Sequence, residues 1–266
     1  MRRYFRIFLL MLQVAFEYKS LSFVWFLTSL VIPLIMLVFW SGATASEGGT
    51  ILGWNYSNFA TYYLFIALAG SLFIAHIEVS VANDDIKNGE LAKFLLKPIP
   101  YLTLNFLGEL PWRLVQGSFT VLSMFIIAFI FQGVVKITTS PSVFMLAVLM
   151  AILAFLMSFV FKMCLGLLAF WFTDIGGLMQ LSDIVLSLCS GIVVPLIFLP
   201  DQFKLLLNVL PFAYMIYYPV LGFLGKLDIS AQFIIMGIQV LWILFFLVLY
   251  KILWFAGRKK FTAIGM

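Results

Sequence analysis

Charged residues are scarce in this sequence, and their scarcity decides the class of protein. Only 10% of the 266 residues are charged, whereas 64% are hydrophobic, and the mean hydropathy is +1.15. Soluble domains contain about 25% charged and about 45 to 50% apolar residues. Because too few charged side chains are present to cover a soluble surface, the composition excludes a soluble protein and predicts an integral membrane protein.

Residues that carry chemistry are also rare. The chain has one histidine, His76, and two cysteines, Cys164 and Cys189, too few for a four-ligand zinc site or for a nucleophile paired with histidine. Residues 222–227 are the nearest approach to a phosphate-binding loop, but they lack its G-x-x-x-x-G-K-[ST] spacing. No two carboxylates lie close together in an apolar run, as a catalytic divalent metal would require. We therefore expect no catalytic residue, metal ion or cofactor in this chain.

Long apolar runs dominate what is present. A helix needs about 20 residues to cross a bilayer, and six runs have about that length. The expected fold is all-α, a single transmembrane domain (1–266) whose six spans cover residues 21–40, 59–79, 112–132, 142–172, 175–199 and 231–255.

Three further segments flank these spans. Residues 1–20 place Arg2, Arg6 and Glu17 on one helix face with apolar residues around the rest, which predicts an interfacial helix. Residues 200–224 are broken by prolines into pieces too short to cross, which predicts re-entrant or external helices before the last span. Residues 80–98 form a polar loop between the second and third spans.

The positions of Lys and Arg predict the orientation. If both termini are cytoplasmic, only Lys136, Lys204 and Lys226 of the 16 cations fall outside. Lys162, between the apolar runs 143–161 and 163–172, counts with the cations of the inner side. Cytoplasmic flanks are enriched in cations and face anionic lipid, so the net charge of +5 requires no nucleic acid. We expect both termini and the polar loop in the cytoplasm.

The polar loop is the natural contact point for a partner outside the bilayer. Asp84 and Asp85 favour the N-terminus of a short helix, and Asn83 or Asp84 could cap it. Asn88 and Gly89 could end it. A capped helix would transmit movement, whereas the alternative is a merely solvated turn.

Asp183 is the one acid well inside an expected span, where a centred carboxylate costs about 2.5 to 3.5 kcal/mol. It either lines a substrate or proton pathway, or it is hydrogen-bonded to Ser182, Ser187 or a neighbouring helix. Near the inner boundary we also expect a layer of ion pairs among Glu78, His76, Glu109 and Arg113.

Several short motifs, taken in order, resemble one known family nearly end to end. They are Lys87-Asn88-Gly89-Glu90-Leu91, Leu95-Leu96-Lys97-Pro98, Ser190-Gly191 with Pro195 and Leu199-Pro200, Leu210-Pro211-Phe212, and the tail from Gly257 to Gly265, with Phe261 where a tyrosine is common. The chain resembles the six-span permease subunit of a bacterial ABC-2-type exporter.

The resemblance implies a role for the polar loop and a set of partners. It implies a coupling helix to an ATPase subunit formed by Asp84, Asp85, Ile86, Lys87, Gly89, Glu90 and Leu91, with Asp183 as the candidate pathway residue. ATP and Mg would be bound by separate ABC ATPase subunits, and a second permease chain, identical or related, would complete the pathway through the lipid of the bacterial inner membrane. The alternative is a secondary transporter or channel driven by an ion gradient, although such folds usually show repeats and more buried ionisable groups.

Overall fold

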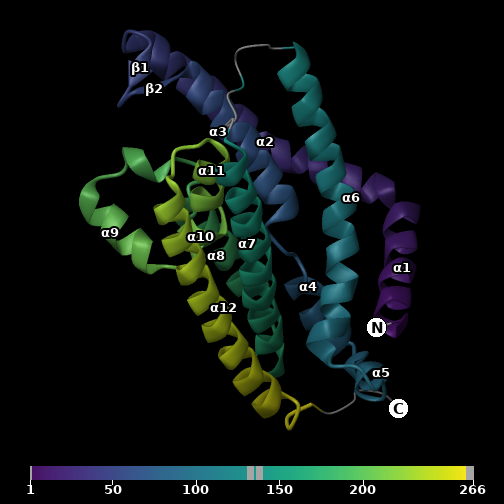
Figure 1. Ribbon diagram of the computed structural model, residues 1–266. Coiled ribbons are helices and arrows are strands. Elements are labelled where there is room, and N and C mark those ends of the chain that lie inside the picture. Colours follow the sequence, from purple (N-terminus) through teal and green to yellow (C-terminus); the bar gives the residue numbers. More distant parts are fainter. Residues whose placement is uncertain (1, 131–134, 136–139, 262–266) are drawn as a thin grey trace.

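The computed structural model describes residues 2–130, 135 and 140–261. Lys136, the last two residues of the expected third span and the end of the C-terminal motif lie outside them. The described chain is helical except for connecting segments and a short antiparallel hairpin, β1 (Thr50–Ile51) and β2 (Trp54–Asn55). Figure 1 shows the hairpin at the upper end of the molecule and the polar loop, with α4 and α5, at the lower end.

Four helices are long and apolar enough to cross a membrane. They are α2 (Lys19–Ser46), α6 (Tyr101–Ile130), α7 (Pro141–Leu167) continued by the 3-10 turn η2 (Leu168–Phe170), and α12 (Ile229–Gly257). A bent pair could form a fifth span: α9 (Asp201–Val209) meets α10 (Phe212–Met215) and α11 (Tyr217–Phe223) at 74°. The protein is therefore an all-α membrane protein with four or five candidate spans.

The second and fifth expected crossings are shorter than their apolar runs. Helix α3 (Tyr56–Leu72) begins at Asn55, whose side chain accepts a hydrogen bond from the Asn58 amide at 3.0 Å, and it ends before an irregular segment, residues 73–77. Helix α8 (Gly176–Cys189) stops before Gly191, whose φ of 85° lies in the left-handed region. With 17 and 14 residues, the two helices fall below the about 20 residues that a typical span needs.

The polar loop contains three short helical pieces. These are α4 (Glu78–Ser80), the π-helix η1 (Val81–Lys87) and α5 (Leu91–Leu95). The helical stretch begins at Glu78, so Asn83 and Asp84, expected to cap it, lie inside η1, which has no side-chain cap. Gly89 has a φ of 79° and separates η1 from α5.

Close packing fixes this loop against the central helix α7. A Cβ atom on Gly166 would lie 2.7 Å from Val81 Cγ1 and 3.0 Å from the Glu78 carbonyl oxygen, so only glycine allows the approach. On the other side of α7, Gln239 of α12 donates from Nε2 to the carbonyl oxygens of Met150 and Tyr214. The helix α7 is thus held between α12 and the loop.

Helix α1 (Arg2–Glu17), expected at the membrane interface, packs against α6. Figure 1 shows it beside the lower part of α6, with its start near the level of the polar loop. Within α1, Ala15 is fully buried, while Phe5 and Phe16 are more than half exposed.

Candidate functional site

The polar loop has an inner and an outer face. Of the seven residues of the expected coupling helix, Asp85, Ile86 and Leu91 are buried, whereas Asp84 and Glu90 are exposed. The two remaining residues of the expected coupling helix, Lys87 and Gly89, are half-buried. The structure therefore brings the seven predicted residues together in one segment and divides them between an anchoring face and a free face.

Asp85 anchors the loop to the helix that follows it. It accepts a hydrogen bond from the hydroxyl of Tyr101, the first residue of α6. The Tyr101 ring stacks on Trp254 of α12, with ring centroids 4.7 Å apart and 9° between the planes. Burial raises the pKa of the Asp85 carboxyl to about 6, although the hydrogen bond from Tyr101 acts in the opposite direction.

Lys162 joins the loop to the helix that carries Asp183. Its Nζ donates to Oε1 of Glu78 at 2.7 Å and to Oδ1 of Asp183 at 2.6 Å. The lysine side chain is fully buried and that of Glu78 is 3% exposed, whereas the Asp183 side chain is 56% exposed. We call these three residues the Lys162 bridge; it connects the start of the loop, α7 and α8.

The bridge changes two expectations from the sequence. Lys162 was expected among the cations of the cytoplasmic side, but its side chain is fully buried inside the protein, where two carboxylates compensate its charge. Glu78 was expected to pair with Arg113, yet it pairs with Lys162. The sequence contained a sign that Lys162 is buried, because it is the one charged residue between two apolar runs, residues 143–161 and 163–172.

A second ion pair lies on α6, as the expected layer partly predicted. Nε of Arg113 is 2.9 Å from Oε1 of Glu109, and Arg113 Nη1 donates to the Ile74 carbonyl oxygen at 3.2 Å. The same Nη1 is 3.1 Å from Nδ1 of His76, whose backbone N–H donates to Glu109. These contacts hold the irregular segment 73–77 against α6.

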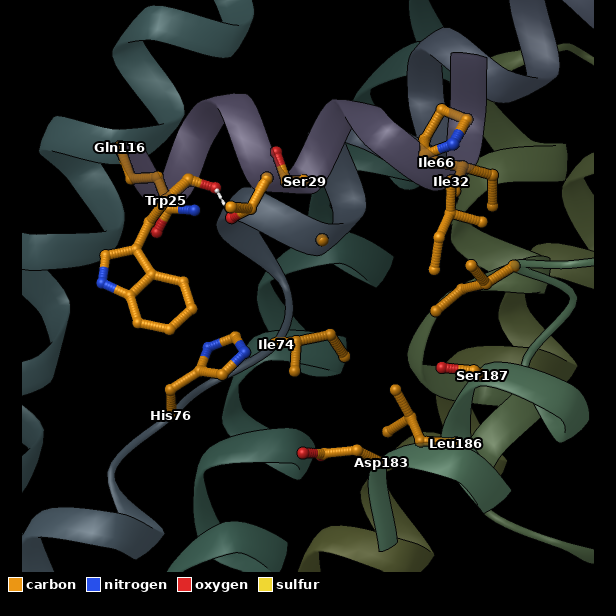
Figure 2. Close-up of a pocket in the computed structure, with 14 residues that line it drawn as sticks. Trp25, Ser29, Ile32, Ile66, Ile74, His76, Gln116, Asp183, Leu186 and Ser187 are labelled. Atoms are coloured by element: carbon orange, nitrogen blue, oxygen red, sulfur yellow. Dashed lines mark hydrogen bonds between the residues drawn. The ribbon is translucent and has the colours of Figure 1, made fainter. Parts of the chain in front are cut away.

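Two cavities adjoin these ion pairs. The Asp183 cavity, about 220 Å³, is lined by side chains of α2, α3, α6 and α8, including Trp25, Ser29, Gln116 and Asp183 (Figure 2). The Arg113 cavity, about 660 Å³, lies between α1, α2, α6 and the loop and reaches Asp84. Trp25, Gln116 and His76 line both cavities, so the two adjoin.

The structure contains no group of three His, Cys, Asp or Glu residues able to hold a metal ion within the described residues. Both cysteines are free, with Cys164 buried and Cys189 half-buried. Polar groups in the site are arranged as paired charges and as cavity linings.

Comparison with known proteins agrees with the motif order in the sequence. Residues 7–265 match a family described as ABC-2 family transporter protein. A search of curated proteins finds no match. Because the family match covers almost the whole chain, the predicted resemblance is confirmed, and the chain belongs to the ABC-2 family of membrane transporter proteins.

Proposed function

We propose that this chain is the permease subunit of an exporter in the bacterial inner membrane, driven by a separate ATPase. It crosses the membrane six times with both termini in the cytoplasm. Four long helices supply four crossings. Helix α3 with segment 73–77, and α8 with residues 190–199, supply the two others, because irregular backbone at membrane depth is tolerated where protein buries it.

The polar loop receives the movement of the ATPase. The observation that carries this proposal is the Lys162 bridge, which ties Glu78, the residue leading into the loop, to Asp183 on α8. A push on the loop reaches α7 through Gly166, where the backbones are in close contact, and reaches α8 through Lys162. The free face of the loop is then the ATPase contact, and the Asp183 cavity is part of the transport pathway.

Exposed residues at the end of the polar loop favour a protein partner that contacts the loop there. Leu95 and Leu96 are 49% and 86% exposed, and they follow the exposed Glu90–Lys93 pair, whose charged atoms are 3.0 Å apart. An exposed apolar pair flanked by charges is suited to a groove on another protein.

Helix α8 supports a second permease chain. Leu181, Ile184 and Leu188 are each more than half exposed on the helix that also carries Asp183. A half-exposed carboxylate at membrane depth is costly when it faces lipid. A second copy or a related permease would cover this face and enclose the pathway.

Two loop variants test the coupling role. Proline fixes φ near −65°, so Gly89→Pro cannot adopt the φ of 79° found there and redirects α5. Glu90→Lys reverses a charge on the free face. In a complex purified with its ATPase, we expect both variants to insert normally but to lose the coupling of ATP hydrolysis to transport in vesicles.

A matched control separates coupling from general damage. Glu47→Lys makes the same charge reversal at an exposed position at the end of α2, next to the hairpin. It should leave coupling intact. If Gly89→Pro and Glu90→Lys complexes keep full hydrolysis and transport, the coupling role of the loop is wrong.

The Lys162 bridge also favours a second candidate, a transporter driven by an ion gradient, because buried ionisable groups mark ion pathways. Vesicles distinguish the two. Transport that requires ATP and persists after ionophores collapse all ion gradients supports the exporter, whereas transport that stops with the gradient and needs no ATP supports the alternative.

A further inference from the structure

The Asp183 cavity combines apolar walls with a single exposed charge. Its walls include Ile32, Ile66 and Leu186, and the Trp25 indole is half exposed at its edge. Figure 2 shows the Asp183 carboxylate directed toward the side of the cavity where Ile74 and His76 lie. With about 220 Å³, the cavity holds a head group or one ring and not a whole amphiphile.

The charges around the cavity leave an excess of one carboxylate. One ammonium, that of Lys162, faces the two carboxylates of Glu78 and Asp183. Asp183 uses only Oδ1 for Lys162, and its Oδ2 makes no hydrogen bond within the described part of the chain. In the adjoining Arg113 cavity, Arg113 is matched by Glu109, so that pair adds no net charge.

A second feature shows that the cavity is arranged for a polar ligand. Gln116 is 95% buried, since only 5% of it is exposed, and it lines both cavities. Its side chain makes no hydrogen bond to any residue that the structure describes, and Figure 2 places it beside Trp25. Its amide atoms are not enclosed by protein, so they are open to the cavity and can hydrogen-bond to a polar group of a ligand.

These groups distinguish between classes of head group. An anionic head group would meet the Asp183 carboxylate without a free cation to compensate it. An uncharged apolar group would leave both Asp183 Oδ2 and Gln116 unpaired. An ammonium would pair with Asp183, and the exposed indole of Trp25 offers the aromatic face that cations prefer.

We propose that the Asp183 cavity binds the cationic head group of a hydrophobic amphiphile, an ammonium whose apolar tail stays in the lipid. This substrate class rests on the proposed function, in which Asp183 lines the transport pathway. Gln116 supplies a polar contact beside the ammonium, and the Arg113 cavity provides an approach from the side of the polar loop.

Binding of three matched probes tests this proposal without ATP. The full chain, in nanodiscs of zwitterionic lipid, is mixed with spin-labelled single-chain amphiphiles whose heads are trimethylammonium, methyl ester or carboxylate. Electron spin resonance measures the fraction of each probe immobilised by the protein. We expect the trimethylammonium probe to bind about tenfold or more tightly than the ester, and the carboxylate probe to bind most weakly.

The variant Asp183→Asn keeps the side-chain shape and leaves Lys162 paired with Glu78. It should abolish the preference for trimethylammonium while leaving ester binding unchanged. The control Asp201→Asn removes the same charge at a position 97% exposed, and the preference should persist.

Equal binding of the three probes to the unaltered chain would overturn the proposal, and this comparison does not depend on any variant folding. A preference that survives in Asp183→Asn would overturn the assignment to this cavity. Because neither measurement involves the ATPase, either failure would leave the coupling role of the loop to be decided by its own experiment.

Discussion

Removal of the Lys162 ammonium tests whether its buried ion pair with Glu78 stabilises the fold. Lys162→Met keeps the length of the side chain and removes its charge. Glu78, 3% exposed, would then be a buried carboxylate without a cation, and its Oε2 already has no hydrogen-bond partner among the described residues. Asp183 would also lose its cation, but the cost is smaller because more than half of its side chain is exposed.

The magnitude follows from the burial of Glu78. Breaking a buried ion pair by removing one partner costs about 3–5 kcal/mol, because an uncompensated charge remains. For a chain of this size, each kcal/mol lowers the unfolding midpoint by about 2–4 °C, so the expected drop is about 6–20 °C. Adding Glu78→Gln to Lys162→Met removes the buried charge, and most of the loss should be recovered.

The buried cysteine Cys164 can report the unfolding of these variants. Cys164 is 4% exposed and its thiol donates to the Phe246 carbonyl oxygen at 3.5 Å, so it reacts with a thiol-specific fluorophore only when α7 and α12 separate. A Cys189→Ala background removes the second, half-buried thiol. Fluorescence against temperature then gives the unfolding midpoint of each variant in nanodiscs.

The matched double variant decides the interpretation. If Lys162→Met alone unfolds at the same temperature as Lys162→Met/Glu78→Gln, the charge of Glu78 is not what the lysine compensates. The same result would remove the physical basis for a link between the loop and α8 through Lys162.

Two further predictions concern the contact of α6 with α3 and the anchoring of the loop. In Gly117→Ala, the new Cβ would lie 2.0 Å from Cδ2 of Leu72, so we expect the free energy of unfolding to fall by about 1–3 kcal/mol. Leu72→Ala removes the clashing atoms. The double variant should therefore unfold at a higher temperature than the sum of the two single shifts predicts. Burial raises the pKa of Asp85 from 3.8 to about 6, so the folded loop binds an extra proton between these values. The contribution of Asp85 to the stability of the loop is therefore fully present below pH 3.8 and is lost as the pH rises through about 6. Hydrogen exchange of the η1 amides, corrected for intrinsic rates, should show this trend in the unaltered chain and not in Asp85→Asn; a trend that persists in the variant would exclude Asp85 as its cause.

Hydropathy predicts the long helices well and the short ones poorly. The expected last span, 231–255, lies within α12, which begins at the side-chain cap Asp228. The expected fifth span ran to residue 199, but α8 ends at Cys189. The cause is tertiary, since the hydroxyls of Tyr62 and Tyr63 donate to the carbonyl oxygens of Gly191 and Val193 and satisfy backbone outside the helix.

The candidate site, too, could be predicted from the sequence only in part. The sequence singled out Asp183 and the polar loop because their polarity contrasts with the apolar residues around them. It could not identify the partner of Asp183, because Lys162 is 21 residues away and Glu78 is 84 residues from that lysine. Spacing along a chain does not show which helices become neighbours, so the Lys162 bridge and the cavities needed the three-dimensional structure.

The irregular segment between α3 and the polar loop limits how far the start of the loop can lie from the end of α3. Ser158 Oγ on α7 accepts a hydrogen bond from the Ala75 amide at 3.0 Å, and Arg113 on α6 donates to the Ile74 carbonyl oxygen. Hydrogen bonds to two different helices therefore hold this short segment in place. Fully stretched, its five residues, 73–77, reach about 17 Å. The start of the loop must therefore stay within about 17 Å of the end of an intact α3, and a greater separation would have to unwind the last turn of that helix.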